Sequence, residues 1–240
     1  MTRESLRPLL DGSLRRRDTG LTEVMDSPEC DPRLLDRTYA QFEAVNALFS
    51  GWRGIYRTGI RPMLSTTVVT HVLDIGSGGG DLTRALARWA ARDGLRLRVT
   101  GIDPDERAIA YATRLQPMRG VEFQRAFSAD LVAEGRRFDI VVSNHMLHHL
   151  SGEQVGALLA DSERLAPRSL HADITRGPVA YAGFGMLTKP FFRDSYIRVD
   201  GLRSIRRSFT PDELAAVLPE GWSAQSRGPF AYVLEARSDA

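Results

Sequence analysis

The stretch VLDIGSGGGDLTRAL (72–86) places four glycines among five residues, between a short apolar run and a helical pattern of apolar side chains. Glycines at such a turn let backbone N–H groups and the N-terminus of the following helix approach a ligand closely. The spacing is G-x-G-x-G over Gly76, Gly78 and Gly80, not the G-x-G-x-x-G of nicotinamide enzymes, and Asp74 lies two residues before the first glycine. This turn predicts a ligand site where a strand runs into a helix.

Strand and helix patterns alternate along the rest of the chain. The expected strands are 71–75, 97–103, 121–126, 138–143 and 169–174, followed by 221–227 and 230–237 on either side of Gly228-Pro229. This alternation predicts an α/β fold: a doubly wound, Rossmann-like, mostly parallel seven-stranded sheet with a C-terminal antiparallel hairpin and a helical N-terminal cap. Ligands of such sheets bind at the carboxyl ends of the strands.

Composition divides the chain into three regions. Residues 1–30 carry scattered charges and glycines, which predicts a mobile arm. Residues 31–65 form the expected helical cap, with apolar residues recurring every three or four positions to about Arg57. Residues 66–240 form the ligand-binding domain, and its segment at about 177–209 is too long for an ordinary loop, which predicts a lid over the substrate.

Aromatic residues in the cap and the lid permit two interpretations. They either cover a pocket for a small, apolar molecule or fill a second small core. The lid residues in question are Tyr181, Phe184, Phe191, Phe192 and Tyr196.

Charge and cysteine content exclude several classes of function. Lys+Arg 32 against Asp+Glu 30 gives a net charge of +2, so no broad positive field attracts nucleic acid. The single cysteine, Cys30, excludes an internal disulfide framework and any multi-cysteine zinc site. No apolar run is long enough to span a membrane and the N-terminus lacks a signal-peptide core, so the cytoplasm is the expected location.

Two further acids are expected at the edge where the glycine turn lies. Asp103 ends the second strand, where a carboxylate can accept hydrogen bonds from both hydroxyls of an adenosine ribose. Asp130 follows the third strand and is placed to meet the exocyclic amine of an adenine ring. Taken singly, each acid is also consistent with a turn or a helix cap.

Four motifs together resemble the class I S-adenosylmethionine-dependent methyltransferases over roughly residues 70–175: VLDIGSGGG, VTGIDPDERAIAYA, FSADL and FDIVVSNHMLHHL. The LHHL step is similar to the branch that includes quinone and polyketide methyltransferases. The resemblance implies that S-adenosylmethionine is the cofactor, with its methionine part on the Gly76–Gly80 loop, its ribose on Asp103 and its adenine edge on Asp130. The residues expected to bind it are Asp74, Gly76, Ser77, Gly78, Gly80, Asp103, Pro104, Asp130 and Asn144.

Three of the five histidines lie in the SNHMLHHL segment, at the expected methyl end of the cofactor. The resemblance implies that His148 is a general base oriented by Asp173, with His145 nearby as a third catalytic residue. His149 is interpreted as a buried packing residue. His71 and His171 lie in strands and are interpreted as structural. A divalent metal on His145, His148, His149 and Asp173 is an alternative, but the spacing of the motif needs no metal, and none is expected.

These features predict methyl transfer to a small molecule, through O-methylation of a phenolic or enolic, aromatic or polyketide-like acceptor. C-methylation by the same base is the runner-up. A non-catalytic module that binds S-adenosylmethionine and a nicotinamide oxidoreductase are further alternatives. The fourth strand ends in SNHM, unlike the N-P-P-Y type of motif that clamps a flipped base, so no nucleic acid partner is expected.

Overall fold

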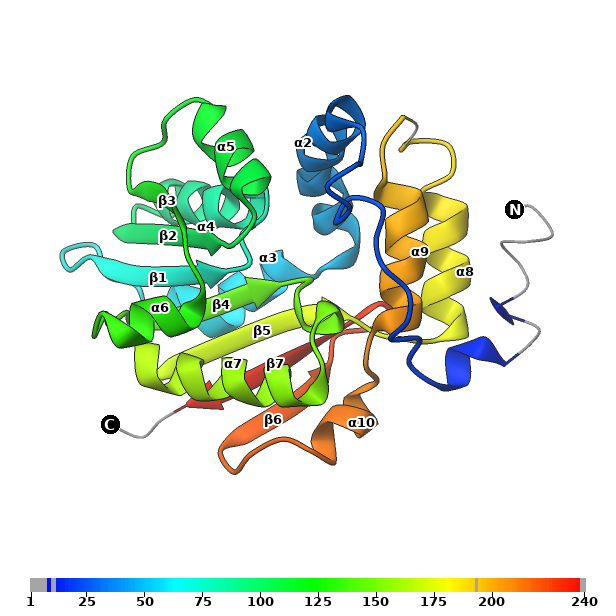
Figure 1. Ribbon diagram of the computed structural model, residues 1–240. Coiled ribbons are helices and arrows are strands. Elements are labelled where there is room, and N and C mark those ends of the chain that lie inside the picture. Colours follow the sequence, from blue (N-terminus) through cyan, green and yellow to red (C-terminus); the bar gives the residue numbers. More distant parts are fainter. Residues whose placement is uncertain (1–7, 10–11, 193, 238–240) are drawn as a thin grey trace.

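The computed structural model describes residues 8–9, 12–192 and 194–237. A twisted sheet forms its centre, with helices packed on both faces and a group of helices at one end (Figure 1). In chain order the elements are η1 (Ser13–Arg15), α2 (Pro32–Phe49), α3 (Trp52–Ile55), η2 (Tyr56–Ile60), η3 (Arg61–Met63), β1 (Thr70–Ile75), α4 (Asp81–Arg92), β2 (Leu97–Asp103), α5 (Glu106–Arg114), β3 (Val121–Arg125), α6 (Ser128–Ala133), β4 (Ile140–Asn144), η4 (Leu147–His149), α7 (Gly152–Leu165), β5 (Arg168–Ile174), α8 (Pro178–Leu187), α9 (Ile197–Arg207), α10 (Pro211–Ala215), β6 (Trp222–Ser226) and β7 (Ala231–Arg237).

The sheet has the strand order β3-β2-β1-β4-β5-β7-β6. The pairs among β1 to β5 are parallel, while β7 lies antiparallel between β5 and β6. The predicted doubly wound sheet with a C-terminal antiparallel hairpin is therefore confirmed. The strand order reverses direction between β1 and β4, which makes the carboxyl ends of these two strands the place where a ligand is expected.

Two apolar layers sandwich the sheet. On one face, Leu131 of α6 and Leu159 of α7 pack with Leu73 and Val141 of the strands. On the other face, Leu86 of α4 belongs to the cluster that joins α3 and η2 to the sheet. The parallel strands are thus covered on both sides, as their continuous apolar pattern requires.

Local sequence signals set several of the helix ends. Ser151 and Gln154 form a capping box at the start of α7, in which each side chain accepts a hydrogen bond from the other's backbone N–H. Thr210 and Glu213 do the same for α10, with Pro211 at its first position. Helix α5 begins at Glu106, two residues after Pro104, because the Asp105 side chain caps it.

Helices α2, α8 and α9 form a cap that stands at the end of the sheet (Figure 1). Val45 and Phe49 of α2 pack with Phe184 of α8 and Ile205 of α9 in a separate apolar cluster. The expected single helix from residue 31 to about residue 57 is interrupted, because Gly51 adopts a left-handed φ of 68° between α2 and α3. The turn lets the chain leave the cap and reach the sheet.

Residues 12–30, here called the N-terminal strap, are packed against the cap, which differs from the mobile arm expected over 1–30. The Asp200 carboxylate of α9 accepts hydrogen bonds from the backbone N–H groups of Val24 and Met25, at 2.7 and 3.0 Å. The guanidinium of Arg17 donates to the Arg207 carbonyl at 2.6 Å. Residues 1–7 and 10–11 of the expected arm lie outside the described residues. Polar contacts that local composition does not reveal hold the strap in place.

The helices that the structure describes include none with the length and apolar character needed to cross a membrane.

Substitution of Gly80 tests how tightly the glycine turn is packed. Its φ is 80°, and a Cβ at this position would lie 2.4 Å from the Phe123 ring, whereas Gly94 has a φ of 71° with no atom within 4 Å of an added Cβ. We expect Gly94→Ala to cost only the left-handed backbone strain, about 1–2 kcal/mol. Gly80→Ala adds overpacking of about 1–3 kcal/mol. Denaturant unfolding of the two variants measures the difference, and equal losses would contradict the close packing of the turn.

Candidate active site

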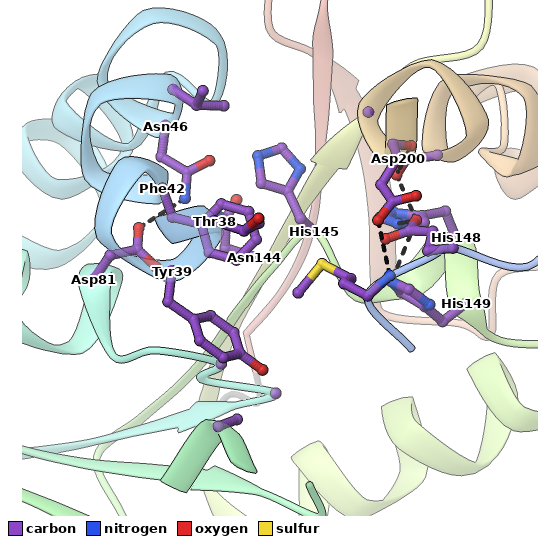
Figure 2. A pocket seen from close by; sticks show the side chains of 18 of the residues that line it. Thr38, Tyr39, Phe42, Asn46, Asp81, Asn144, His145, His148, His149 and Asp200 are labelled. Carbon is purple, nitrogen blue, oxygen red and sulfur yellow. Dashed lines mark hydrogen bonds and ion pairs between the residues drawn. The ribbon is translucent and has the colours of Figure 1, made fainter. Parts of the chain in front are cut away.

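A cavity of about 360 Å³ lies where the carboxyl ends of β1, β2 and β4 face the cap and the strap. Its wall toward the sheet contains the glycine turn, Asp103 and Asn144, and its opposite wall comes from α2, α9 and the strap. Figure 2 shows the labelled side chains of α2 on one side, Asp200, His148 and His149 on the other, and the His145 ring between them. The cavity is within the size range of small-molecule sites.

The glycine turn brings backbone N–H groups to the cavity. Gly76 and Gly78 have φ values of 70° and 52°, and a Cβ on Gly76 would lie 2.7 Å from the Met146 sulfur. The Gly78 N–H and the Asp105 N–H each donate to the Asp103 carboxylate at 2.9 Å. Burial raises the pKa of Asp103 above its ordinary value, against the lowering by these two bonds. Each oxygen of Asp103 accepts one backbone bond, which leaves lone pairs for a ligand.

Asp74 supports the turn from beneath. Its buried carboxylate accepts a hydrogen bond of 2.6 Å from the Thr83 hydroxyl on α4. Burial raises its pKa to about 8, although the Thr83 bond acts in the opposite direction. Asp74 borders the cavity, as expected, and joins the end of β1 to the first turn of α4.

Three buried polar atoms on the cavity wall have no hydrogen-bond partner among the described residues: Ser77 Oγ, Asn46 Oδ1 and Asn144 Oδ1. The Asn46 amide also donates to the Asp81 carboxylate at 2.7 Å, an interaction drawn in Figure 2. Buried polar groups without a partner are uncommon in folded proteins and suggest a missing ligand. The amide oxygens of Asn46 and Asn144, together with the Asp81 carboxylate, are suited to bind an ammonium group.

Pro104 and Asp130, the two residues expected near an adenine ring, differ in position. Pro104 borders the cavity. Asp130 is exposed, and its carboxylate accepts a hydrogen bond of 2.8 Å from the Phe127 N–H at the start of α6. Because Asp130 caps this unpredicted helix and is absent from the described cavity lining, its expected contact with adenine is not supported.

His148 contacts the predicted carboxylate. Its Nδ1 lies 2.8 Å from Asp173 Oδ1, and its backbone N–H donates to Asp173 Oδ2 at 2.9 Å. Its other ring nitrogen, Nε2, lies 3.0 Å from Oε1 of Glu23 in the strap. Burial lowers the pKa of His148, but the two carboxylates outweigh it and raise the pKa to about 10. In this arrangement His148 has no ring nitrogen free to take a proton from a ligand.

Glu23 is one of the cavity residues that the sequence did not indicate. It is buried and accepts a hydrogen bond from the Ser204 hydroxyl of α9. Burial raises its pKa, but the electrostatic influence of His149 and His148 and the hydrogen bonds from His148 and Ser204 outweigh this and lower the pKa to about 2. Its sequence context, a polar segment without periodicity, offers no signal of burial.

His145 and His149 are the two histidines of the motif whose side chains stay partly exposed. His145 adopts a left-handed φ of 54° at the end of β4, and its Nδ1 lies 3.6 Å from Asp173 Oδ1. The His149 side chain is 30% exposed, against 2% for His148, so the histidine buried by packing is His148 and the interpretation of His149 was wrong.

The aromatic residues of the lid fill a core more than they cover the cavity. Of the five named above, Phe184 alone is found in the described cavity lining. Tyr181, Phe192 and Tyr196 are buried elsewhere, and Phe191 is 73% exposed. Tyr39 and Phe42 of α2 supply the other rings at the cavity.

Comparison with known protein families finds a match for the segment that contains the glycine turn. Residues 72–167, which include the turn, Asp103 and the histidine motif, match a family model described as "Methyltransferase domain". This part of the chain is a class I methyltransferase domain.

Sequence relatives of the methyltransferase domain are named ubiquinone biosynthesis O-methyltransferase. The protein of Roseobacter denitrificans is 31% identical over 115 residues, which are 46% of this chain and 44% of that protein. The protein of Pseudomonas aeruginosa strain UCBPP-PA14 is 31% identical over 160 residues, 65% of this chain and 62% of that protein. The chain thus spans less than two thirds of the length of these curated relatives.

Solved structures share the fold of the methyltransferase domain. Human N-acetylserotonin methyltransferase, crystallised with S-adenosylmethionine, has a TM-score of 0.62 and 15% identity, covering 99% of this chain and 68% of that chain. The plantazolicin methyltransferase BpumL, crystallised with S-adenosylhomocysteine, has a TM-score of 0.54 and 13% identity, covering 86% and 95% of the two chains.

His171 on β5 is a structural histidine whose burial should make stability depend on pH. It is buried between the Ser143 and Ser162 hydroxyls, 2.8 and 3.1 Å from its ring nitrogens. Burial lowers its pKa from 6.5 to about 3. Between about pH 6.5 and pH 3, the His171 imidazole is protonated in the unfolded chain but neutral in the folded chain. The contribution of His171 to the free energy of unfolding is therefore full above pH 6.5 and decreases as the pH falls toward 3.

We expect the free energy of unfolding to fall more steeply below pH 6.5 in the parent protein than in His171→Gln. The difference in slope approaches about 1.4 kcal/mol per pH unit, the linkage value for one proton. Urea unfolding at a series of pH values measures both slopes, and parallel curves would show that His171 does not resist protonation.

Proposed function

We propose that the chain is an S-adenosylmethionine-dependent methyltransferase that O-methylates a phenolic or enolic hydroxyl of a small, apolar molecule. The observation that carries the proposal is one continuous cavity with two chemically different halves. One half joins the glycine turn to Asp103 and to the partnerless atoms of Asn46 and Asn144. The other half is lined by apolar side chains and by histidines.

The first half fits the chemical groups of the cofactor. Asp103 supplies carboxylate lone pairs for the ribose hydroxyls, and Pro104 and Ala108 supply apolar contacts for the base. The oxygens of Asn46 and Asn144 accept hydrogen bonds from the amino group of the methionine part. Structural neighbours crystallised with S-adenosylmethionine or S-adenosylhomocysteine support this use of the fold.

The second half suits an apolar acceptor with one reactive oxygen. Its apolar lining comes from the cap: Phe42, Val45, Phe184, Ile197 and Ile205. Its polar groups include His145, His149 and Asp200. The relatives named as ubiquinone biosynthesis O-methyltransferases support transfer to oxygen.

The proposed chemistry requires a proton acceptor next to the hydroxyl. When bound, S-adenosylmethionine supplies an electrophilic methyl group on a sulfonium sulfur. A phenol has a pKa of about 10, so removal of its proton makes the oxygen a better nucleophile. We assign this role to His145, which faces the cavity beside Asp173, and we assign to His148 the positioning of Asp173 and Glu23. The cap excludes water and favours the neutralisation of charge during transfer.

Measurement of cofactor affinity distinguishes Asp103 from Asp130, the two acids that the sequence predicted to contact the adenosine. We expect Asp103→Asn to weaken binding of S-adenosylhomocysteine by about 10- to 100-fold, because one charge-assisted pair of hydrogen bonds is worth about 1.5–3 kcal/mol. Asp130→Asn is the matched control, since its carboxylate bonds the Phe127 N–H. Calorimetric titration gives both affinities. No binding by the parent protein, or equal losses in the two variants, would contradict the proposal.

Turnover tests the role of His145. We expect His145→Asn to lower kcat by about 10²- to 10⁴-fold, the usual contribution of a general base. Asparagine tolerates the left-handed backbone, so the fold is retained. Affinity for S-adenosylhomocysteine should stay unchanged, and His71→Asn, at an exposed position, is the control.

The parent protein is incubated with phenolic and enolic acceptors and an isotopically labelled donor. NMR of the product then shows which atom carries the labelled methyl group. A C-methyl product would replace O-methylation with the alternative reaction. Undiminished kcat in His145→Asn would remove the base assignment.

A further inference from the structure

Three side chains with metal-binding atoms converge where the strap crosses η4. The candidate ligand atoms of Glu23, His148 and His149 all lie within 4.8 Å of one another. Glu23 Oε1 is 3.0 Å from His148 Nε2 and 3.7 Å from His149 Nε2. Two ligands that are each about 2.1 Å from a tetrahedral zinc ion lie about 3.4 Å apart. The two observed separations lie on either side of this value.

Both histidines have a carboxylate at their second ring nitrogen. His148 Nδ1 lies 2.8 Å from Asp173 Oδ1, and His149 Nδ1 lies 3.4 Å from Asp26 Oδ2. Histidines that bind metal through one nitrogen commonly donate the other N–H to a carboxylate, which fixes the tautomer and the ring orientation. Both rings therefore direct Nε2 toward the same oxygen of Glu23.

The cluster is open on the cavity side. Glu23, His148 and His149 all line the cavity, as does Ser204, whose hydroxyl donates a hydrogen bond to Glu23 Oε1 and holds the carboxylate in place. Catalytic zinc sites use three protein ligands and leave a fourth position for water or substrate, whereas structural sites are closed by four. The part-exposed side chains of His149 and Asp26 give an ion a path from solvent.

We propose that Glu23, His148 and His149 form a binding site for a divalent transition metal ion, with zinc as the preferred occupant. Two imidazoles and one carboxylate suit zinc better than magnesium or calcium, which prefer oxygen ligands. The ion takes the place of the proton shared by His148 Nε2 and Glu23 Oε1, and that proton is released to solvent.

The role of the ion rests on the proposed function. In that reaction the acceptor oxygen completes the coordination, and the positive charge lowers the pKa of the hydroxyl whose proton His145 takes. The metal site itself depends only on the strap and the histidine motif, and none of its three ligands is assigned to the cofactor. Metal binding and cofactor binding can therefore be measured separately.

Titration of chelator-treated protein with Zn²⁺ by calorimetry, and with Co²⁺ by visible absorption, tests the site. We expect saturation at one equivalent, with the intense absorption of low-coordinate Co²⁺. Glu23→Gln and His149→Ala should each remove this binding. Asp26→Asn should weaken it by about 10- to 100-fold, as loss of a carboxylate behind a ligating histidine does elsewhere. Asp18→Asn is the control from the same strap, because its carboxylate pairs with Arg206.

The result that overturns the proposal is either no Zn²⁺ binding by the parent protein or binding that persists in both ligand variants. Affinity for S-adenosylhomocysteine, measured on the same samples, shows whether each variant is folded and tests the proposed function independently. If Glu23→Gln does not fold, His149→Ala decides the matter, since it leaves the His148–Asp173 contact in place.

Discussion

The buried carboxylate of Asp173 is the constraint on which the arrangement of this site depends. It is buried near the carboxyl end of β5, a strand paired on both sides with β4 and β7, where an ionised group without partners would be strongly destabilising. His148 satisfies it through both its ring and its backbone N–H. His148 is itself buried, so its second nitrogen needs a partner, which Glu23 provides. The need to satisfy a buried carboxylate of the sheet thereby fixes the position of Glu23 and of the strap that carries it.

The strap is held by contacts along its length. Arg17 donates to the carbonyls of His148 and Leu150, at 3.3 and 3.1 Å, beside the histidine motif. Asp200 accepts the N–H groups that follow Glu23, and its burial raises its pKa to about 6 despite those two bonds. These interactions join the strap to α9 and to η4, so the cavity wall is built from segments far apart in sequence. An acceptor that enters this half of the cavity meets side chains ordered before it arrives, which is favourable for positioning.

Sequence patterns anticipated the proposed cofactor half of the cavity better than the proposed acceptor half. Gly76, Gly78 and Asp103 lie at consecutive strand ends, and parallel strands necessarily bring those ends to one edge. Asn46 comes from a different element, but it had a signal: it lies four residues after Phe42 and three before Phe49, on the inward face of α2. A polar residue among apolar ones on a buried face suggests a specific partner. Glu23 had no comparable signal, because its segment follows no periodicity.

The family resemblance suggested the pairing of His148 with Asp173, whereas the residue pattern by itself determined the alternation of strands and helices and the edge at which a ligand is expected. These follow from short-range patterns: burial on both faces of a parallel strand, glycine at a positive φ and acids at strand ends. Only the tertiary structure decided that Asp130 caps a helix, that His148 is enclosed while His149 faces the cavity, and that Glu23 meets both rings. Those outcomes depend on which distant segment covers each side chain, and burial by a distant segment leaves no local pattern in the chain.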